Sequence, residues 1–396
     1  MRSNPLAYLD VELNDLRAQG LYRPLRVLDA EQKAHTSIDH RSVVNLSSNN
    51  YLGLTTHPRL RERAREALDT LGVGTGSVRT IAGTMAIHVE LERRLAAFKK
   101  TEAAVVFQSG FTANAGTVSS LLGRDDVIVS DELNHASIID GARLSRATIK
   151  VFPHRDVGAA RSILAELPRT QRTLLITDGV FSMDGDLGPL PALCDLADEF
   201  GCIMMVDDAH ASGVFGRQGR GTIDHFDMHG RVDVQVGTLS KALGALGGYV
   251  AGSRSLIDFL HRRARPFLFS TSHPPSVAAT CLAAVDVLES EPQWMEQLWE
   301  NTRFFKSGLQ ALGFDTGISE SPITPVVVGD GALAMTLSDQ LFEAGVFAQG
   351  IAFPTVAKGR ARVRTIVTAT HTRDELEFAL EAFGRVGRRL GILGGA

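Results

Sequence analysis

The sequence predicts an α/β protein in which a large domain built on a mostly parallel sheet precedes a smaller α+β domain, with a helical segment at the N-terminus. Six short apolar runs alternate with helical stretches between residues 103 and 251. Such alternation is typical of a mainly parallel sheet covered by helices on both faces. The chain has 396 residues, which is too long for one small core, and it is 44% hydrophobic and 22% charged, as soluble globular proteins are.

The N-terminal part is expected to hold a helix, a strand and a second helix. Leucines recur at helical spacing over residues 5–19, and Gly20 is typical of a helix C-terminus. The next expected elements are a strand over 43–46, a turn over 49–53 and a charged helix over 58–71.

The central part supplies the strands of the predicted sheet. The apolar runs cover residues 103–107, 127–129, 174–177, 203–206, 234–236 and 249–251. In a mostly parallel sheet, ligands bind beyond the carboxyl ends of the strands. The polar residues that follow each run are therefore the first candidates for a site.

The C-terminal part is expected to form the smaller domain. Long helices are predicted over 275–290 and 292–312, and the domain boundary is expected between them. Strands over 324–328 and 362–367 and helices over 333–343 and 372–386 follow. We therefore expect an N-terminal segment over 1–57, a large domain over 58–290 and a small domain over 291–396.

The composition disfavours several classes of protein. A formal net charge of −4, without a basic stretch interleaved with aromatic residues, argues against nucleic acid as a partner. The three cysteines form no CxxC pair, which disfavours structural zinc and a disulfide framework. We see neither a signal-peptide pattern nor an apolar stretch of membrane-spanning length, so we expect a cytoplasmic protein without a membrane partner.

Three strand ends carry residues with chemical potential. Asp207 and His210 follow the run 203–206, and Lys241 follows the run 234–236 in a glycine-rich stretch. Gly110 follows the run 103–107 and opens a helix, where backbone N–H groups can bind phosphate. Taken singly, each has an ordinary interpretation, as a turn cap, a surface lysine or a plain turn.

Taken together, these groups are what pyridoxal 5′-phosphate requires. A lysine forms a Schiff base with the aldehyde, a carboxylate keeps the pyridine nitrogen protonated, and a helix N-terminus balances the phosphate charge. His135, after the run 127–129, could stack on the flat ring. The stretch 72–77 is rich in glycine but follows a helix and lacks the GxGxxG spacing, so a dinucleotide site is not expected there.

The motifs resemble one family over nearly the whole chain, the α-oxoamine synthases among the fold-type I pyridoxal phosphate enzymes. The resemblance is carried by SSNNYLGL at 47–54, SDELNHASIIDG at 130–141, TDGVFSMDGD at 177–186, VDDAHASG at 206–213 and TLSKALGALGGY at 238–249. The chain looks most like the branch that joins glycine C-acetyltransferases (2-amino-3-ketobutyrate CoA ligases) and 8-amino-7-oxononanoate synthases. The resemblance implies the fold-type I transferase fold.

The resemblance also implies a role for each matching residue. It makes Lys241 the cofactor lysine, Asp207 the partner of the pyridine nitrogen and His135 the stacked ring. The remaining implied roles fall to His210 and Ser182 near the ring hydroxyl, to Gly110, Phe111 and Thr238 at the phosphate, to Ser270 and Thr271 reaching that phosphate from a second subunit, and to Arg364 and Asn49 at the substrate carboxylate. A homodimer with shared active sites is therefore implied.

The expected activity is condensation of a small amino acid, glycine or L-alanine, with an acyl-CoA thioester, with release of CoA. Lys241 would remove the Cα proton of the amino acid. The sequence leaves open the acyl chain, the amino acid and whether the product loses its carboxylate. An aminotransferase or a carbon–sulfur lyase of the same fold, or a non-catalytic pyridoxal phosphate-binding protein, are the alternatives.

Overall fold

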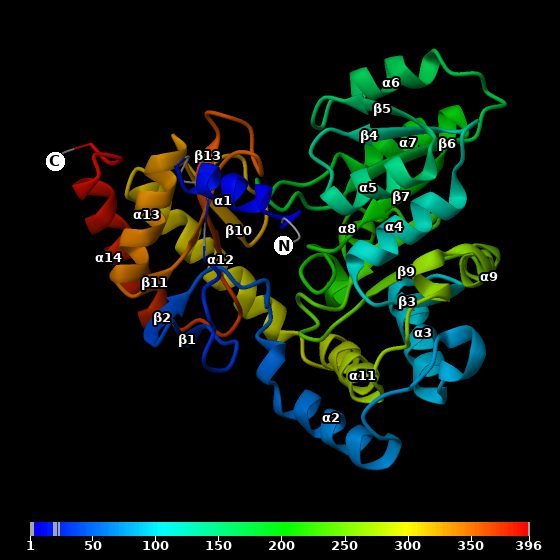
Figure 1. Ribbon diagram of the computed structural model, residues 1–396, viewed down its shortest axis with the longest axis horizontal. Helices are drawn as coiled ribbons and strands as arrows, with labels where there is room; N and C mark the ends of the chain where they lie inside the picture. The colour runs from blue at the N-terminus through cyan, green and yellow to red at the C-terminus, as the bar shows by residue number, and fades with distance from the viewer. Residues whose placement is uncertain (1–3, 19–21, 23, 395–396) are drawn as a thin grey trace.

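A seven-stranded sheet forms the centre of the structure, a computed structural model that describes residues 4–18, 22 and 24–394 (Figure 1). Strand β9 pairs antiparallel with both of its neighbours, and the other pairs are parallel. The strands, in their order across the sheet, are β3 (Ala103–Phe107), β9 (Gly248–Gly252), β8 (Val234–Thr238), β7 (Ile203–Asp207), β6 (Thr173–Asp178), β4 (Val127–Asp131) and β5 (Thr148–Phe152). The predicted α/β class and mostly parallel sheet are confirmed.

Helices cover both faces of this sheet, as the buried apolar runs require. On one face a core joins the strands to α4 (Gly110–Leu121), α5 (Ala136–Ser145), α9 (Arg254–Arg263) and α10 (Arg265–Leu268). On the other face a second core joins them to α6 (Val157–Ala165), α7 (Leu190–Phe200) and α8 (Thr222–His225). Strand β5 lies at the edge and exposes most of its residues, which is why its short mixed run did not stand out in the sequence.

The sheet brings polar residues together at one edge. Parallel strands have their carboxyl ends on the same side. The last residues of the adjacent strands β4, β6, β7 and β8 are Asp131, Asp178, Asp207 and Thr238. Asp178 and Asp207 are direct register partners.

The C-terminal part forms a separate sheet with its own helices, on the left of Figure 1. Its antiparallel sheet has the order β10 (Ile323–Gly329), β13 (Ala361–Ile366) and β12 (Gln349–Ile351), and its helices are α12 (Gln293–Ala311), α13 (Gly331–Glu343) and α14 (Arg373–Arg389). A third sheet joins the N-terminal strands β1 (His35–Ile38) and β2 (Arg41–Asn45) to β11 (Val346–Phe347). We propose the boundaries near residues 57 and 290, with the N-terminal strands packed on the small domain.

Three helices lie at the base of the molecule in Figure 1. They are α2 (Pro58–Leu71), α3 (Ala86–Lys99) and α11 (Pro275–Ser290), and α11 packs against the other two. Short helical turns occupy Leu54–Thr56, Arg79–Gly83 and Arg217–Gly219. The glycine-rich stretch 72–77 is the connection after α2 rather than a strand-to-helix turn. It therefore lacks the context that a dinucleotide-binding glycine motif requires.

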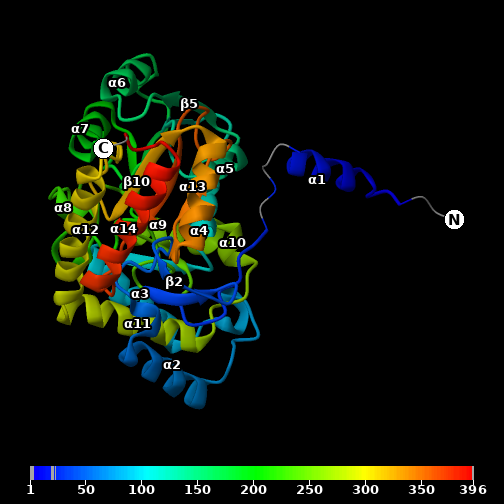
Figure 2. The same ribbon diagram turned by 90° about the vertical axis from the view of Figure 1, so that its left-hand side faces the viewer.

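Helix α1 (Tyr8–Ala18) buries none of its residues and projects from the body of the molecule (Figure 2). Gly20, the predicted C-terminal glycine of this helix, lies outside the described residues. In the described part of the chain, no helix has the length and hydropathy needed to cross a membrane.

Candidate active site

A cavity of about 200 Å³ lies at the carboxyl ends of the central strands. Eight of the residues singled out in the sequence line it: Gly110, Phe111, His135, Ser182, Asp207, His210, Thr238 and Lys241. These residues are spread over more than a hundred positions of the chain, from Gly110 to Lys241. The sheet topology, rather than any local motif, therefore assembles the site.

Lys241 lines this cavity and is its candidate nucleophile. Burial lowers the pKa of its amine to about 8, although the charges of Asp207 and Asp178 oppose the shift. An amine with such a pKa is partly unprotonated at neutral pH. It can therefore attack an aldehyde or accept a proton.

Two carboxyl groups stand side by side next to Lys241. Asp207 accepts hydrogen bonds from Asn114 Nδ2, at 2.6 Å, and from the backbone N–H of Ala209, at 2.8 Å. Burial, together with the charge of Asp207, raises the pKa of Asp178 well above its usual range. Two protein donors thus hold the carboxylate of Asp207, whereas Asp178 accepts the N–H of His135 and its raised pKa favours the neutral form.

Asp208, the next residue in the chain, forms a buried ion pair in the core instead. Successive side chains of a strand point to opposite faces, and Asp208 points away from the cavity. Its fully buried carboxylate pairs with the buried ammonium of Lys99 at 3.0 Å and accepts a hydrogen bond from Thr222. Asp207 thus lines the cavity while Asp208 belongs to the core.

Two histidines line the cavity as neutral rings. Burial lowers the pKa of His135, and its Nδ1 accepts the backbone N–H of Ser137, so the ring proton is on Nε2. Burial and the nearby Lys241 lower the pKa of His210 far more strongly. His210 Nδ1 lies 2.7 Å from Tyr51 Oη, whose own pKa burial raises, so the phenol holds the imidazole through a neutral hydrogen bond.

The N-terminus of α4 forms another wall. Ser109 caps the helix by accepting the N–H of Thr112 at 3.1 Å, and the first N–H groups of a helix have no partner within it. Gly110 lies next to Thr238, since a Cβ built on the glycine would lie 3.4 Å from that side chain, at ordinary contact distance. This is a fitting place for a phosphate group.

Four of the singled-out residues do not line the cavity. Arg364 lies at its edge, where Nη1 donates a 2.9 Å hydrogen bond to the carbonyl of Ser182. The buried Oδ1 of Asn49 has no hydrogen-bond partner among the described residues. Ser270 is half-buried and Thr271 exposed, and the carbonyl of Thr271 accepts from Gln108 Nε2 at 2.7 Å, just before the α4 cap.

The sequence did not predict three residues that line the cavity or contact its walls. Asn114 follows Gly110 by one helical turn, so the two residues lie on the same face of α4. Asp178 is the last residue of β6, so the strand-end rule could have found it. Tyr51 lies in the SSNNYLGL stretch, but no spacing signal connects it with His210, which is 159 residues away.

The residues of the cavity fit pyridoxal 5′-phosphate. The cavity offers an amine for the aldehyde, an oriented carboxylate, a flat imidazole and a helix N-terminus beside a hydroxyl. Asn114 Oδ1 is buried here without a hydrogen-bond partner in the described residues, which is a polar group available to a bound molecule. Among the described residues no cluster of side chains suits a metal ion.

Comparisons with known proteins agree with this chemistry. A family model described as aminotransferase class I and II matches residues 41–383. The chain is 60% identical to an 8-amino-7-oxononanoate synthase of Symbiobacterium thermophilum over 98% of this chain and 99% of that one, and 56% identical to one of Bacillus pumilus over 98% of both. A serine palmitoyltransferase of S. paucimobilis, solved with a PLP–myriocin aldimine, superposes with a TM-score of 0.93 at 32% identity over 98% of both chains.

Proposed function

Because the chain belongs to the aminotransferase class I and II family, and within it to the α-oxoamine synthases, we propose that it condenses L-alanine with pimeloyl-CoA. It is a pyridoxal 5′-phosphate-dependent acyltransferase. The observation that carries the proposal is the meeting of Lys241, Asp207 and the N-terminus of α4 in one cavity, in a chain so similar to 8-amino-7-oxononanoate synthases.

The product after which these relatives are named fixes the substrates. An 8-amino-7-oxononanoate has nine carbons, with a terminal methyl group next to the carbon that bears the amine. The methyl and amine carbons are those of alanine without its carboxylate, and the other seven carbons form a dicarboxylic acyl chain. Atoms balance when L-alanine and pimeloyl-CoA give the amino-oxo acid, CoA and carbon dioxide. Glycine would leave no methyl group.

The proposed cofactor contacts follow from the walls of the cavity. When bound, pyridoxal phosphate supplies a ring that withdraws electrons from the amino acid. We assign the phosphate to the backbone of Gly110 and Phe111 with Thr238, the pyridine nitrogen to Asp207 and the flat face to His135. His210 and Ser182 lie where they could bind the ring hydroxyl.

The protein also supplies a base and a carboxylate anchor. Lys241 would hold the cofactor covalently. Its Nζ would also serve as the base for the Cα proton of L-alanine, since its lowered pKa of about 8 leaves part of the amine unprotonated. The guanidinium of Arg364, at the edge of the cavity, suits bidentate binding of the alanine carboxylate. We assign Asn49, whose buried Oδ1 has no hydrogen-bond partner among the described residues, to assist it.

A homodimer completes the proposed enzyme. Ser270 and Thr271 do not line the cavity of their own chain, which is compatible with a role at the phosphate of a second subunit. We also propose the cytoplasm as its compartment, as the composition indicates.

The test is CoA release by the protein loaded with pyridoxal phosphate, with glycine and L-alanine each combined with acetyl-CoA and pimeloyl-CoA. L-alanine with pimeloyl-CoA should be the preferred pair. The Lys241→Ala variant should lose at least about 100-fold in turnover, the scale of general-base catalysis. Preference for glycine with acetyl-CoA would replace the proposed substrates, and full activity of Lys241→Ala would refute the assigned lysine.

A further inference from the structure

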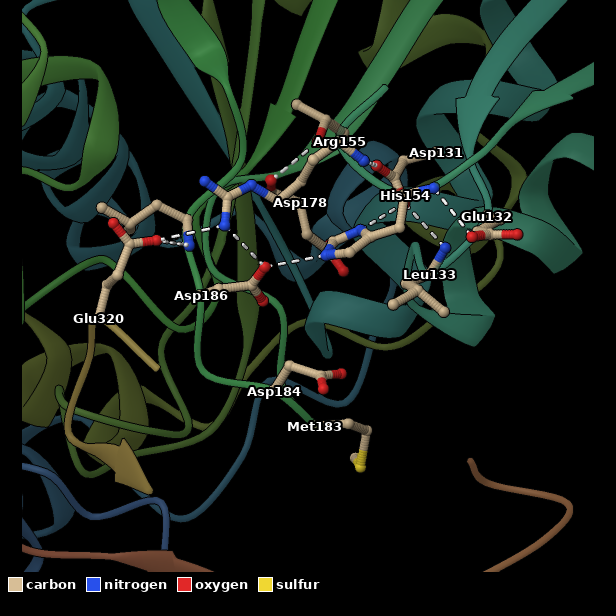
Figure 3. A network of polar contacts seen from close by, with 12 residues as sticks. Asp131, Glu132, Leu133, His154, Arg155, Asp178, Met183, Asp184, Asp186 and Glu320 are labelled. Carbon is tan, nitrogen blue, oxygen red and sulfur yellow. Dashed lines mark hydrogen bonds and ion pairs between the residues drawn. The ribbon is translucent and has the colours of Figure 1, made fainter. Parts of the chain in front are cut away.

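A polar network outside the cavity joins two loops that carry cavity residues (Figure 3). At its centre, His154 Nδ1 lies 3.0 Å from Asp131 Oδ1, and Nε2 lies 2.9 Å from Asp186 Oδ2. Asp131 is the end of β4, and Asp186 belongs to the loop between β6 and α7. Both carboxylate side chains are fully buried, and that of His154 is 17% exposed.

The geometry makes His154 a cation. A ring whose two nitrogens each meet a carboxylate oxygen donates from both, which only the imidazolium can do. Burial alone would lower the pKa of His154, but the hydrogen bonds and charges of Asp131 and Asp186 outweigh burial and raise it to about 9. The other charged groups of this network are Glu132, Arg155 and Glu320, together with Asp178 at the end of β6 and Asp184 on the loop of Asp186.

Arg155 reinforces the same connection. Its backbone N–H donates to Asp131 Oδ2 at 2.9 Å, and its Nη1 lies 3.2 Å from Asp186 Oδ2 and 3.4 Å from Glu320 Oε2. Glu320 Oε2 also accepts the N–H of Leu187 at 3.2 Å. The loop after β6 is thereby tied to the large sheet and to the segment that leads into β10.

The first tethered loop leads to His135. Asp131 Oδ1 accepts the N–H of Leu133 at 2.9 Å, and two residues later the N–H of His135 donates to Asp178 Oδ2 at 3.0 Å. The second loop, residues 179–189, carries Ser182. Its far side is held by Arg362, which donates to the carbonyl of Met183 at 3.0 Å, and by Arg364, which donates to the carbonyl of Ser182.

The ring of His154 also packs edge-on against Phe181, the residue before Ser182, with ring centroids 4.4 Å apart. The histidine therefore contacts this loop twice, through Asp186 and through Phe181. Loss of its charge would leave Asp186 with Arg155 as its remaining cationic partner and weaken the support of the segment that carries Ser182.

We propose that His154 is a positioning residue whose positive charge holds the loops of His135 and Ser182 in fixed positions around the bound cofactor. The inference deepens the proposed function and rests on the assignment of the cavity as the pyridoxal phosphate site. His154 itself does not line the cavity, so it acts through its contacts with Asp131, Asp186 and Phe181.

The test compares cofactor binding by three variants, measured by titrating the apo-protein with pyridoxal phosphate. His154→Gln removes the charge, leaves the buried carboxylate of Asp131 without a charged partner and leaves that of Asp186 with Arg155 alone. The Kd should therefore rise about 10-fold, within the usual range of coupling through packed networks. Adding Asp186→Asn removes one of those carboxylates and should bring the Kd back to within about threefold of the wild-type value.

His229→Gln is the matched control, because His229 also pairs with a fully buried carboxylate, that of Asp224 at 2.9 Å, and is 20% exposed. It lies outside the cavity and should leave the Kd unchanged even if it lowers the Tm. A Kd for His154→Gln within twofold of wild type would overturn the proposal, since a purely structural histidine would change only the Tm.

If His154→Gln does not fold, the pH dependence of the wild type takes its place. The ratio of the wild-type Kd to that of His154→Gln/Asp186→Asn should rise about 10-fold between pH 8 and pH 10, as His154 loses its proton, and a constant ratio would overturn the proposal. The proposed function fails separately: tight cofactor binding without acyl transfer would refute the substrates and leave the role of His154 intact.

Discussion

Asn114 Nδ2 donates a 2.6 Å hydrogen bond to Oδ2 of Asp207, and so fixes the carboxylate that faces Lys241 in the cavity. The other oxygen of Asp207 is held by the N–H of Ala209. Each carboxylate oxygen thus has one protein donor. The orientation of the group does not depend on a bound molecule, so the site is organised before the cofactor arrives.

Removing this donor should weaken cofactor binding. A hydrogen bond to a charged group contributes about 1.5–3 kcal/mol, so Asn114→Ala should raise the Kd for pyridoxal phosphate roughly 10- to 100-fold. Absorbance titration of the apo-protein measures it. Thr117→Val, in the same helix, is the control, because the buried hydroxyl of Thr117 has no partner among the described residues. Equal Kd values for the two variants would contradict the role of Asn114.

The two adjacent aspartates should respond differently to the same substitution. Asp207→Asn removes the charge that faces the cofactor and should lower kcat by about 100- to 1000-fold, the usual loss for a preorganised electrostatic group. Asp208→Asn leaves the buried Lys99 ammonium without its carboxylate and should cost about 3–5 kcal/mol of unfolding free energy. Urea denaturation and steady-state kinetics on both variants separate the two effects. If Asp207→Asn lost as much unfolding free energy as Asp208→Asn, the assignment of Asp207 to the cavity and Asp208 to the core would be contradicted.

The buried Lys241 predicts an unusual pH dependence of the apo-protein. Its pKa in the folded state, about 8, lies below the ordinary value of 10.5, so the folded chain binds fewer protons than the unfolded chain between these values. The free energy of unfolding should therefore rise from about pH 8 to pH 10.5, by roughly 3 kcal/mol through this group. Below pH 8 the destabilisation caused by burying Lys241 should be constant.

The Lys241→Met variant isolates this contribution, since other titrating groups are common to both proteins. Urea denaturation of both apo-proteins at pH 7 to 10 should show wild type gaining stability relative to the variant as pH rises. Parallel stability curves would mean that Lys241 is not desolvated.

Arg364 should govern affinity for the amino acid rather than for the acyl-CoA. Arg364→Lys keeps the charge but loses the planar fork, so the KM for L-alanine should rise about 10-fold or more while the KM for pimeloyl-CoA stays constant. Arg360→Lys, at an exposed position just before the same strand, is the control. A rise in the KM for pimeloyl-CoA alone would move Arg364 to the acyl-CoA site.

The sequence predicts the buried elements of this fold better than the exposed ones. The runs that became β3, β6 and β7 are continuous and apolar because both faces of the sheet are covered. Strand β5 lies at the edge with mixed polarity, and β12 has three residues, so neither carries a periodic signal long enough to detect. Pairing of β11 with β2 joins segments some three hundred residues apart, which no local pattern encodes.

The site shows the same division. Lys241 and Asp207 could be predicted because each follows a buried strand, and the ends of parallel strands meet at one edge. Tyr51 and His154 could not be predicted in this way, since their partners are set by packing between distant loops. Residues that carry chemistry thus follow from topology, whereas residues that position them emerge only from the three-dimensional contacts.

The fate of the alanine carboxylate tests the central claim most directly. With L-alanine labelled with carbon-13 at its carboxylate and with pimeloyl-CoA, the loaded enzyme should release one labelled carbon dioxide for each CoA and form an unlabelled amino-oxo acid with the mass of 8-amino-7-oxononanoate. Formation of labelled pyruvate without CoA release would instead identify an aminotransferase and contradict the account.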